Sequence, residues 1–206
     1  MALVDRVKNI LLSPRTEWQV IDAEPATVAS LYTGYIIPLA AIPAICQALG
    51  MALIGYSIPF VGGHYRTPIV TALTSAVVMY CFTLVAVFIV ALVVDGLAPT
   101  FGGTKNQVQA LKVVAYSYTA SWIGGILGLI PALSIIGILF GLYSLYLLFL
   151  GLPVLMKAPA DKAVVYTVVV VVCTIIITWV IFFAVAAMGF GMGAGAMAGA
   201  GSPYRP

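Results

Sequence analysis

Charged side chains are scarce in this chain of 206 residues: 7% are Asp, Glu, Lys or Arg, against about 25% in a typical soluble domain. Histidine occurs once, as His64, in a predicted external loop. Metal sites built from several histidines, and nucleophilic triads that need a histidine base, are therefore excluded or strongly disfavoured. The few charges lie in loops and near helix ends, which gives nucleic-acid binding no support. We expect no enzymatic activity and no cofactor or metal.

Cysteine is also rare, and Cys46, Cys81 and Cys173 all lie inside apolar runs, where they are expected to act as small buried hydrophobic residues. Hydrophobic residues make up 63% of the chain. Because backbone groups in lipid must be satisfied within a segment, these runs predict helices. The predicted fold class is an all-α polytopic membrane protein with five transmembrane helices and an N-terminal amphipathic helix.

Three regions are expected along the chain. Residues 1–24 form a cytoplasmic amphipathic segment, in which Leu3, Val7 and Ile10 share one face and Arg6 and Lys8 lie on the other. This segment either lies on the membrane surface or packs under the bundle, and both arrangements are compatible. Residues 25–187 form the membrane domain. Residues 188–206 form a glycine-rich flexible tail.

The membrane domain divides into four apolar stretches: 29–55, 68–94, 107–156 and 163–187. The third is too long for one span, since about 20 residues cross the hydrocarbon core. Pro131 is the helix breaker near its middle, so this stretch predicts two antiparallel helices joined by a very short turn. The last stretch is rich in β-branched residues, but a lone strand in lipid leaves its backbone unsatisfied, so a helix is predicted.

Small residues recur at helical spacing on both halves of the predicted hairpin and mirror each other about a point between Ala132 and Leu133. Residues at equal depth have numbers that sum to 265. This register pairs Gly128 with Gly137, Gly124 with Gly141, and Ser121 with Ser144. The first series continues to Ser117, opposite Leu148, and the second continues to Gly151, opposite Val114. Such residues let two helices approach closely in lipid. The register predicts that leucine at Gly124 or Gly141 destabilises the fold.

Polar residues within the apolar stretches or at their margins are the remaining candidates for interaction or function: Gln47, Asp95, Lys112, Tyr116, Tyr143 and Tyr146. An interhelical hydrogen bond is the favoured role for Gln47. Asp95 and Lys112 are expected to pair and hold the second and third spans together. The amide and the tyrosines are alternatively expected to line a polar cavity for a neutral solute, although packing and interfacial roles are favoured.

Basic residues indicate the orientation in the membrane. Seven Lys and Arg residues lie in the amino-terminal segment, the second loop and the fourth loop, whereas the other side holds two, Arg66 and Arg205. The positive-inside rule therefore predicts a cytoplasmic amino terminus and a carboxyl terminus on the opposite side.

Most of the chain, excluding the glycine-rich tail, resembles the Yip-domain family of five-span membrane proteins, especially its bacterial branch. The residues that carry the resemblance are Phe101-Gly-Gly, Ala110, Lys112, Ala115-Tyr116-Ser117, Trp122, Pro131, Gly141-Leu-Tyr143, Tyr146, Gly151-Leu-Pro153 and Met156. In the amino-terminal segment, Ser13-Pro14 followed by Trp18 and Ile21 also matches that branch.

The resemblance implies a non-enzymatic integral membrane scaffold or interaction protein whose partners are the lipid bilayer, itself or other membrane proteins. Eukaryotic relatives bind Rab-type GTPases, but their acidic motif has no match here beyond Asp22-Ala-Glu24-Pro25. Ala120 also replaces an expected proline. Rab binding is therefore not expected, and the bacterial inner membrane is the expected location, with a periplasmic carboxyl terminus. The alternative function is a channel or carrier for a small neutral solute.

Overall fold

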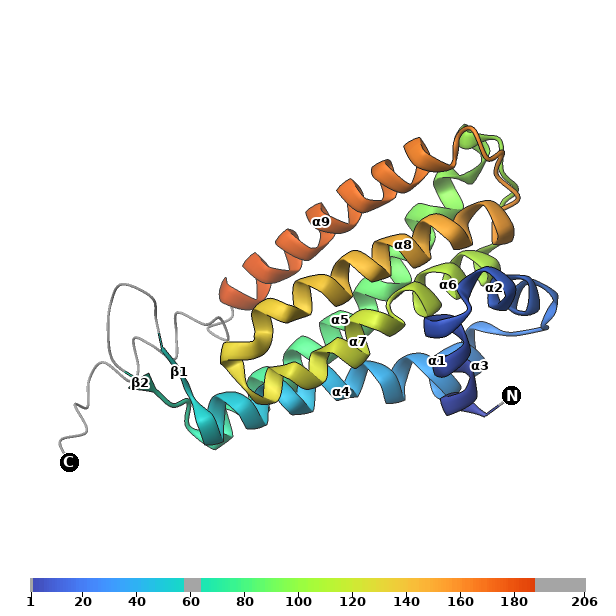
Figure 1. Ribbon diagram of the computed structural model, residues 1–206. Coiled ribbons are helices and arrows are strands. Elements are labelled where there is room, and N and C mark those ends of the chain that lie inside the picture. The colour runs from blue at the N-terminus through green and yellow to red at the C-terminus, as the bar shows by residue number, and fades with distance from the viewer. Residues whose placement is uncertain (1, 58–63, 188–206) are drawn as a thin grey trace, which may run out of the picture.

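The computed structural model describes residues 2–57 and 64–187, so the predicted glycine-rich tail, 188–206, lies outside the described residues. The fold is helical apart from a pair of two-residue antiparallel strands, β1 (Tyr56–Ser57) and β2 (His64–Tyr65). Within the described residues, four helical segments are long and apolar enough to cross a membrane: Val28–Ile54, Ile69–Phe101, Gly137–Leu155 and Ala163–Ala187. The chain is therefore a helical membrane protein (Figure 1).

The first of these segments is composite. It consists of α3 (Val28–Leu31), a π-helical turn (Tyr32–Ile36), α4 (Ile37–Leu49) and a second π-helical turn (Gly50–Ile54). A reciprocal cap starts it, because Ser30 N–H donates to Thr27 Oγ1 at 3.1 Å and Thr27 N–H donates to Ser30 Oγ at 2.9 Å. Pro38 and Pro43 both lie in α4, between the two wider turns.

The second segment, α5 (Ile69–Leu97), continues past the predicted end at Val94 and is followed by a 3₁₀ turn (Ala98–Phe101). Gly102 ends this turn with φ at 77°, a left-handed conformation that favours glycine. Asp95 therefore lies within the last turns of the helix, not in a loop.

The predicted hairpin is present, but its first arm is interrupted. That arm consists of α6 (Gln107–Ser117), α7 (Thr119–Gly124) and a 3₁₀ segment (Gly125–Leu129). A second 3₁₀ segment (Pro131–Ile136) leads into α8 (Gly137–Leu155). The very short turn predicted at Pro131 was therefore wrong. Glycine has low helix propensity and proline lacks an N–H group, so tighter turns replace the α-helix around the bend.

The hairpin register is confirmed at one pair. Ser121 N–H donates to Ser144 Oγ at 3.0 Å, and the two hydroxyl oxygens are 2.8 Å apart. The last helix, α9 (Ala163–Ala187), is continuous despite its β-branched residues and packs on α5 and α8.

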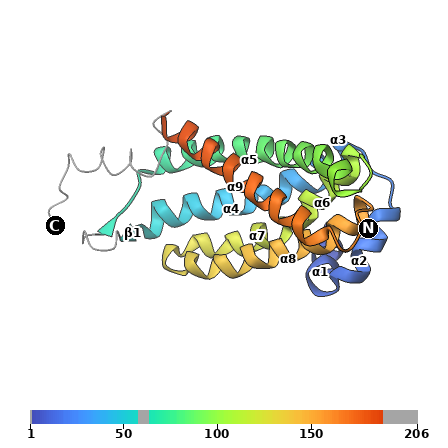
Figure 2. The same cartoon turned by 90° about the horizontal axis from the view of Figure 1, so that it is seen from above.

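Two short helices, α1 (Leu3–Leu12) and α2 (Pro14–Ala23), lie across the end of the bundle where α6 begins and α8 ends (Figures 1 and 2). They pack against the hairpin, with α2 on α8 and α1 on α7. The segment thus packs at the end of the bundle, one of the two arrangements that the sequence left open.

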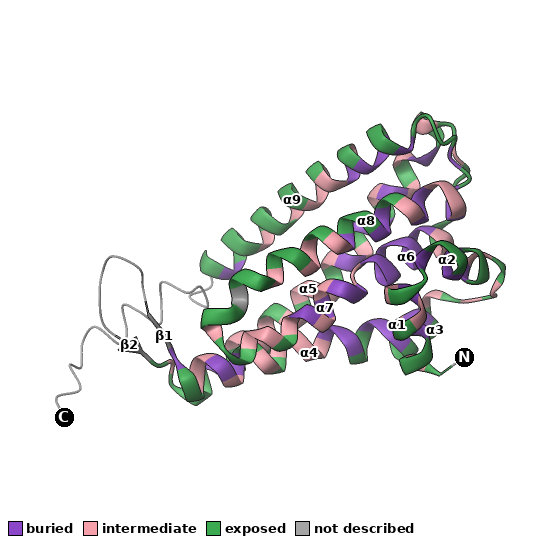
Figure 3. Cartoon of the chain, in the orientation of Figure 1, coloured by how far each residue is buried: buried purple, intermediate pink, exposed green. Residues whose placement is uncertain are grey.

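Burial is strongest at this end of the molecule (Figure 3). Every residue of α6 from Ala110 to Ser117 is buried. The outer faces of α5, α8 and α9 expose large apolar side chains, as on Val70, Leu139 and Val180, which are 72%, 64% and 63% exposed. Such a surface suits contact with lipid hydrocarbon.

Candidate functional site

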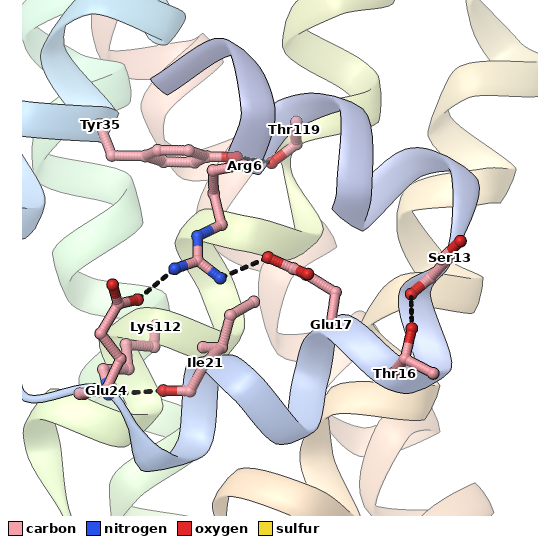
Figure 4. A network of polar contacts seen from close by, with 9 residues as sticks. All are labelled: Arg6, Ser13, Thr16, Glu17, Ile21, Glu24, Tyr35, Lys112 and Thr119. Atoms are coloured by element: carbon pink, nitrogen blue, oxygen red, sulfur yellow. Dashed lines mark hydrogen bonds and ion pairs between the residues drawn. The ribbon is translucent and has the colours of Figure 1, made fainter. Parts of the chain in front are cut away.

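A cluster of charged side chains joins α1 and α2 to the bundle (Figure 4). Arg6 on α1 pairs through separate guanidinium nitrogens with Glu17 on α2 and with Glu24 just after α2. Arg6 and Glu17 are only 4% and 5% exposed. The sequence placed Arg6 on the polar face of its helix, and the structure buries it there, because α2 folds back over α1 and encloses the guanidinium group.

The carboxyl end of α2 is bound by side chains from the hairpin. Lys112 Nζ donates to the carbonyl oxygens of Ile21 at 2.8 Å and Glu24 at 2.5 Å. A cation placed there satisfies carbonyl groups that lack helical partners and also interacts favourably with the helix dipole. Asp22 accepts from Gln109 Nε2 at its side chain, 3.1 Å, and pairs with Lys157. We call this set the amino-terminal ionic cluster: Arg6, Glu17, Asp22, Glu24, Gln109, Lys112 and Lys157.

Aromatic side chains pack beneath this cluster. The Tyr116 ring lies 4.5 Å from Tyr35 and 6.3 Å from Trp18, measured between ring centroids, and the Arg6 guanidinium lies 5.7 Å from its centre. Tyr35 and Thr119 form a hydroxyl–hydroxyl hydrogen bond of 2.6 Å. The aromatic layer therefore supports the buried cation of α1 from the membrane side, partly by cation–π attraction.

The predicted pair between Asp95 and Lys112 does not form. Lys112 is occupied with the end of α2, and Asp95 Oδ1 is buried with no hydrogen-bond partner among the described residues. A different contact joins this part of α5 to α9, because Tyr166 donates to the Val94 carbonyl oxygen at 2.5 Å. The reason is geometric: α6 presents Lys112 to the amino-terminal helices.

The remaining polar candidates are not gathered in one site. Tyr116 is buried, Tyr143 donates to the Leu11 carbonyl oxygen at 2.7 Å, and Tyr146 is 40% exposed. Gln47 is exposed on α4 and forms no hydrogen bond to a described residue, so the expected interhelical bond is absent. None of the three tyrosines lines either of the two cavities described next.

The described residues line two cavities that bear on these candidates. The larger, of about 390 Å³, lies between the hairpin, α5 and α9, and its wall includes Ser117, Ser121, Gly141 and Ser144. The smaller, of about 210 Å³, lies between α4 and the hairpin, where Gln47 and Gly137 form part of the wall. Across residues 2–57 and 64–187, no group of three His, Cys, Asp or Glu residues is placed to hold a metal ion.

Three glycines of the predicted small-residue series contact other residues, and two of these contacts lie outside the hairpin. A Cβ atom on Gly124 would lie 2.4 Å from Phe140 Cγ, and one on Gly151 would lie 2.8 Å from Trp18 Cζ2. Gly128 faces Gln47 on α4, whose Cα would be 3.5 Å away. The series therefore packs against three different partners.

Gly137 and Gly141 depart from the prediction. Neither would bring an added Cβ atom within 4 Å of another residue. The expected close packing at these two positions was wrong, because Gly141 borders the larger cavity and Gly137 the smaller one, while Phe140 makes the contact with Gly124.

These contacts predict different outcomes for two glycines that the sequence treated alike. Gly124→Leu is expected to lower the free energy of unfolding by about 1–3 kcal/mol, because the new side chain overlaps the Phe140 ring. Gly141→Leu is expected to be tolerated, since its side chain enters open space. Thermal aggregation in lipid nanodiscs measures both. Equal melting of the two variants contradicts this assignment.

Comparison with known proteins identifies the family of this architecture. The Yip1 domain family model matches residues 8–182. The chain belongs to the Yip1 domain family. The matched region of this Yip1-domain protein includes α2, the complete hairpin and most of α9.

The inner membrane protein YohC of Escherichia coli strain K12 is 28% identical to this Yip1-domain protein over 153 residues. The alignment covers 73% of this chain and 78% of YohC. YohC of Escherichia coli O6:H1, strain CFT073, is similar to the same extent. No solved structure matches the chain. The predicted resemblance to the Yip family is thus confirmed.

Sequence reasoning missed the centre of the ionic cluster. It identified Lys112 and Trp18, but it did not connect Arg6 with Glu17 and Glu24. One signal was available: Arg6, Glu17 and Glu24 all lie in a segment otherwise expected to contact an apolar bundle. Buried charges there need partners.

Proposed function

We propose that this Yip1-domain protein is a non-enzymatic membrane scaffold that binds other membrane proteins or itself. The observation that carries the proposal is the way α1 and α2 pack together against the hairpin. A two-helix platform, formed by α1 and α2, is fixed there by the amino-terminal ionic cluster. Such a platform presents a constant surface, which favours binding over transport of a neutral solute.

The outer face of the platform has features of an interaction surface. Val4 and Leu12 on α1 are 75% and 71% exposed, next to exposed polar residues such as Lys8 and Arg15. Apolar side chains among charged ones at a membrane surface suit contact with lipid headgroups or with another protein.

The proposed architecture has five crossings, with the interrupted arm 107–129 as the third. At about 1.5 Å per residue this arm extends roughly 35 Å, enough for the ~30 Å hydrocarbon core. The break at Tyr118 is enclosed by neighbouring helices, where irregular backbone is tolerated. The loops that hold Lys105 and Lys157 lie at the platform end, and Thr104 N–H donates to the Met156 carbonyl oxygen at 2.8 Å.

The proposed location is the bacterial inner membrane, with the platform in the cytoplasm. The excess of basic residues at the platform end supports this orientation. In intact cells, cysteine at position 105 (Lys105→Cys) is expected to be protected from a membrane-impermeant maleimide, whereas Arg66→Cys is labelled. The native cysteines are first replaced by alanine. Labelling of position 105 alone reverses the orientation.

The scaffold proposal is tested by affinity purification from membranes extracted directly into polymer-bounded lipid discs. Wild-type protein is expected to recover a second membrane protein or additional copies of itself. The double variant Val4→Ser/Leu12→Ser is expected to lose the partner while keeping the wild-type melting temperature, because both side chains are exposed.

The matched control is Val70→Ser, which changes a similarly exposed residue on α5, away from the platform. Recovery of only the monomeric protein, together with glycerol uptake into proteoliposomes, contradicts the scaffold and supports a channel or carrier for a neutral solute.

A further inference from the structure

The larger cavity contains an unsatisfied polar group. Ser117 is 4% exposed and lines this cavity, and its Oγ atom has no hydrogen-bond partner among the described residues. Hydroxyl groups on membrane helices commonly bond back to a carbonyl one turn earlier, as Thr167 does to Ala163 at 2.7 Å and Thr174 does to Val170 at 2.8 Å. Leaving such a group unpaired in hydrocarbon costs free energy. No described residue pairs with the Ser117 hydroxyl, so a partner from outside the protein would lower that cost.

The backbone next to Ser117 is irregular as well. Helix α6 ends at Ser117, and Ser121 N–H donates to Ser144 Oγ on α8 instead of continuing the helix with a bond to the Ser117 carbonyl. Ser121 and Ser144 satisfy each other, and Thr174 bonds to its own helix. Among the serine and threonine hydroxyls of this wall, Ser117 is therefore the one without a hydrogen-bond partner among the described residues.

The cavity has the size and the access of a small-molecule site. Its volume of about 390 Å³ falls within the range of about 300–1,000 Å³ for ligand pockets. Leu142, Leu145 and Ile175 line it and are 57%, 40% and 51% exposed on the outer surface of the bundle. A molecule dissolved in the bilayer can therefore reach the cavity from the side.

Depth in the membrane restricts the ligand. Ser117 lies ten residues after the start of α6, roughly 15 Å along the helix at about 1.5 Å per residue, near the middle of a ~30 Å hydrocarbon core. A phospholipid headgroup does not belong at that depth, because charge there is expensive. The ligand is therefore uncharged.

We propose that this cavity binds an uncharged, membrane-soluble amphiphile. Its alkyl body fills the space between α8 and α9, and its hydroxyl or carbonyl group forms a hydrogen bond with Ser117. Binding gives the Ser117 hydroxyl a hydrogen-bond partner within its apolar environment. The site is filled with or without a protein partner on the platform, so this proposal and the scaffold function are tested separately.

The test uses photoactivatable lipids with the complete protein in nanodiscs. The probes are hexadecanol and methyl hexadecanoate, each with a diazirine on the alkyl chain, and crosslinked residues are identified by mass spectrometry. Labelling is expected to concentrate on Leu142, Leu145 and Ile175. It is expected to exceed at least fivefold the labelling of Val168 and Val180, which are exposed on α9 but do not line the cavity.

Two variants separate filling of the cavity from loss of the hydrogen bond. Gly141→Leu occupies the space and is expected to remove the preferential labelling, whereas Gly137→Leu, one turn away and outside this cavity, retains it. Ser117→Ala is expected to weaken labelling by one of the two probes about threefold to tenfold, the effect of one hydrogen bond. A diazirine hexadecane without a polar group is unaffected. The alanine variant melts at or above the wild-type temperature, because Oγ has no partner to lose.

Labelling by both probes that is no stronger in the cavity than at Val168, or that persists in Gly141→Leu, overturns the proposal. Crosslinking of the cavity to a second polypeptide in native membranes also overturns it, because the occupant is then the helix of a protein partner. The hydroxyl and carbonyl probes together identify which group Ser117 binds.

Discussion

Replacing Arg6 with methionine is expected to lower the free energy of unfolding by about 3–5 kcal/mol, the effect of removing one partner from a buried ion pair. The Glu17 side chain is 7% exposed and would remain enclosed without its cation. Methionine preserves the length of the side chain, so the loss of charge dominates. The expected fall in melting temperature is on the order of 10 °C. Thermal aggregation in nanodiscs measures it.

A second measurement reports the position of the platform. Limited proteolysis is expected to cut Arg6→Met near Arg15 before the membrane helices are lost, since the ionic cluster is what joins α1 and α2 to the hairpin. The control is Lys8→Met on the exposed side of the same helix. The double variant Arg6→Met/Glu17→Gln is expected to recover part of the stability, because it removes the unpaired charge. An Arg6→Met variant as stable as Lys8→Met contradicts the importance of this pair.

The second large effect is expected at Gly50, where the first crossing meets the bend of the hairpin. An added Cβ atom would lie 2.1 Å from the Gly128 carbonyl oxygen and 2.8 Å from that of Leu129. These are backbone atoms that cannot rotate away, so one of the two segments must move. Gly50→Ala is therefore expected to cost about 3 kcal/mol, at the upper end of the usual range for overpacking.

Gly34 offers a matched control in the same helical segment. It also lies in a π-helical turn, but an added Cβ atom finds nothing within 4 Å. Gly34→Ala is expected to leave the melting temperature unchanged or slightly raised, because alanine favours helical backbone. The melting temperature and expression level of both variants test this difference. Equal stability of the two variants shows that the contact at Gly50 relaxes without cost.

The ion pairs of the platform and the glycine contacts have different physical roles. Glycine contacts set how closely helices approach in lipid, where apolar burial gives no drive for association. The ionic cluster acts outside that region. It links α2 to α6 and to the loop after α8, through Lys112 and Lys157. A buried charge network is demanding about geometry, so it favours one position of the platform, a role consistent with the proposed scaffold.

The sequence by itself determined the class of this protein, because scarce charges and long apolar runs leave only membrane helices that satisfy their own backbone. It also predicted the family and the level at which Ser121 meets Ser144, since helical spacing and mirror symmetry fix the register of a hairpin. These properties depend on residues close together in the chain or on composition.

The tertiary structure alone decided which polar groups meet. Arg6 became buried because α2 folds over α1, and Lys112 bonds to α2 instead of Asp95 because of the direction in which α6 presents it. Gly124 and Gly141 look alike in the sequence, yet one packs against Phe140 and the other borders a cavity. Such contacts depend on how helices distant in sequence are placed in space, and periodicity within one helix does not specify that placement.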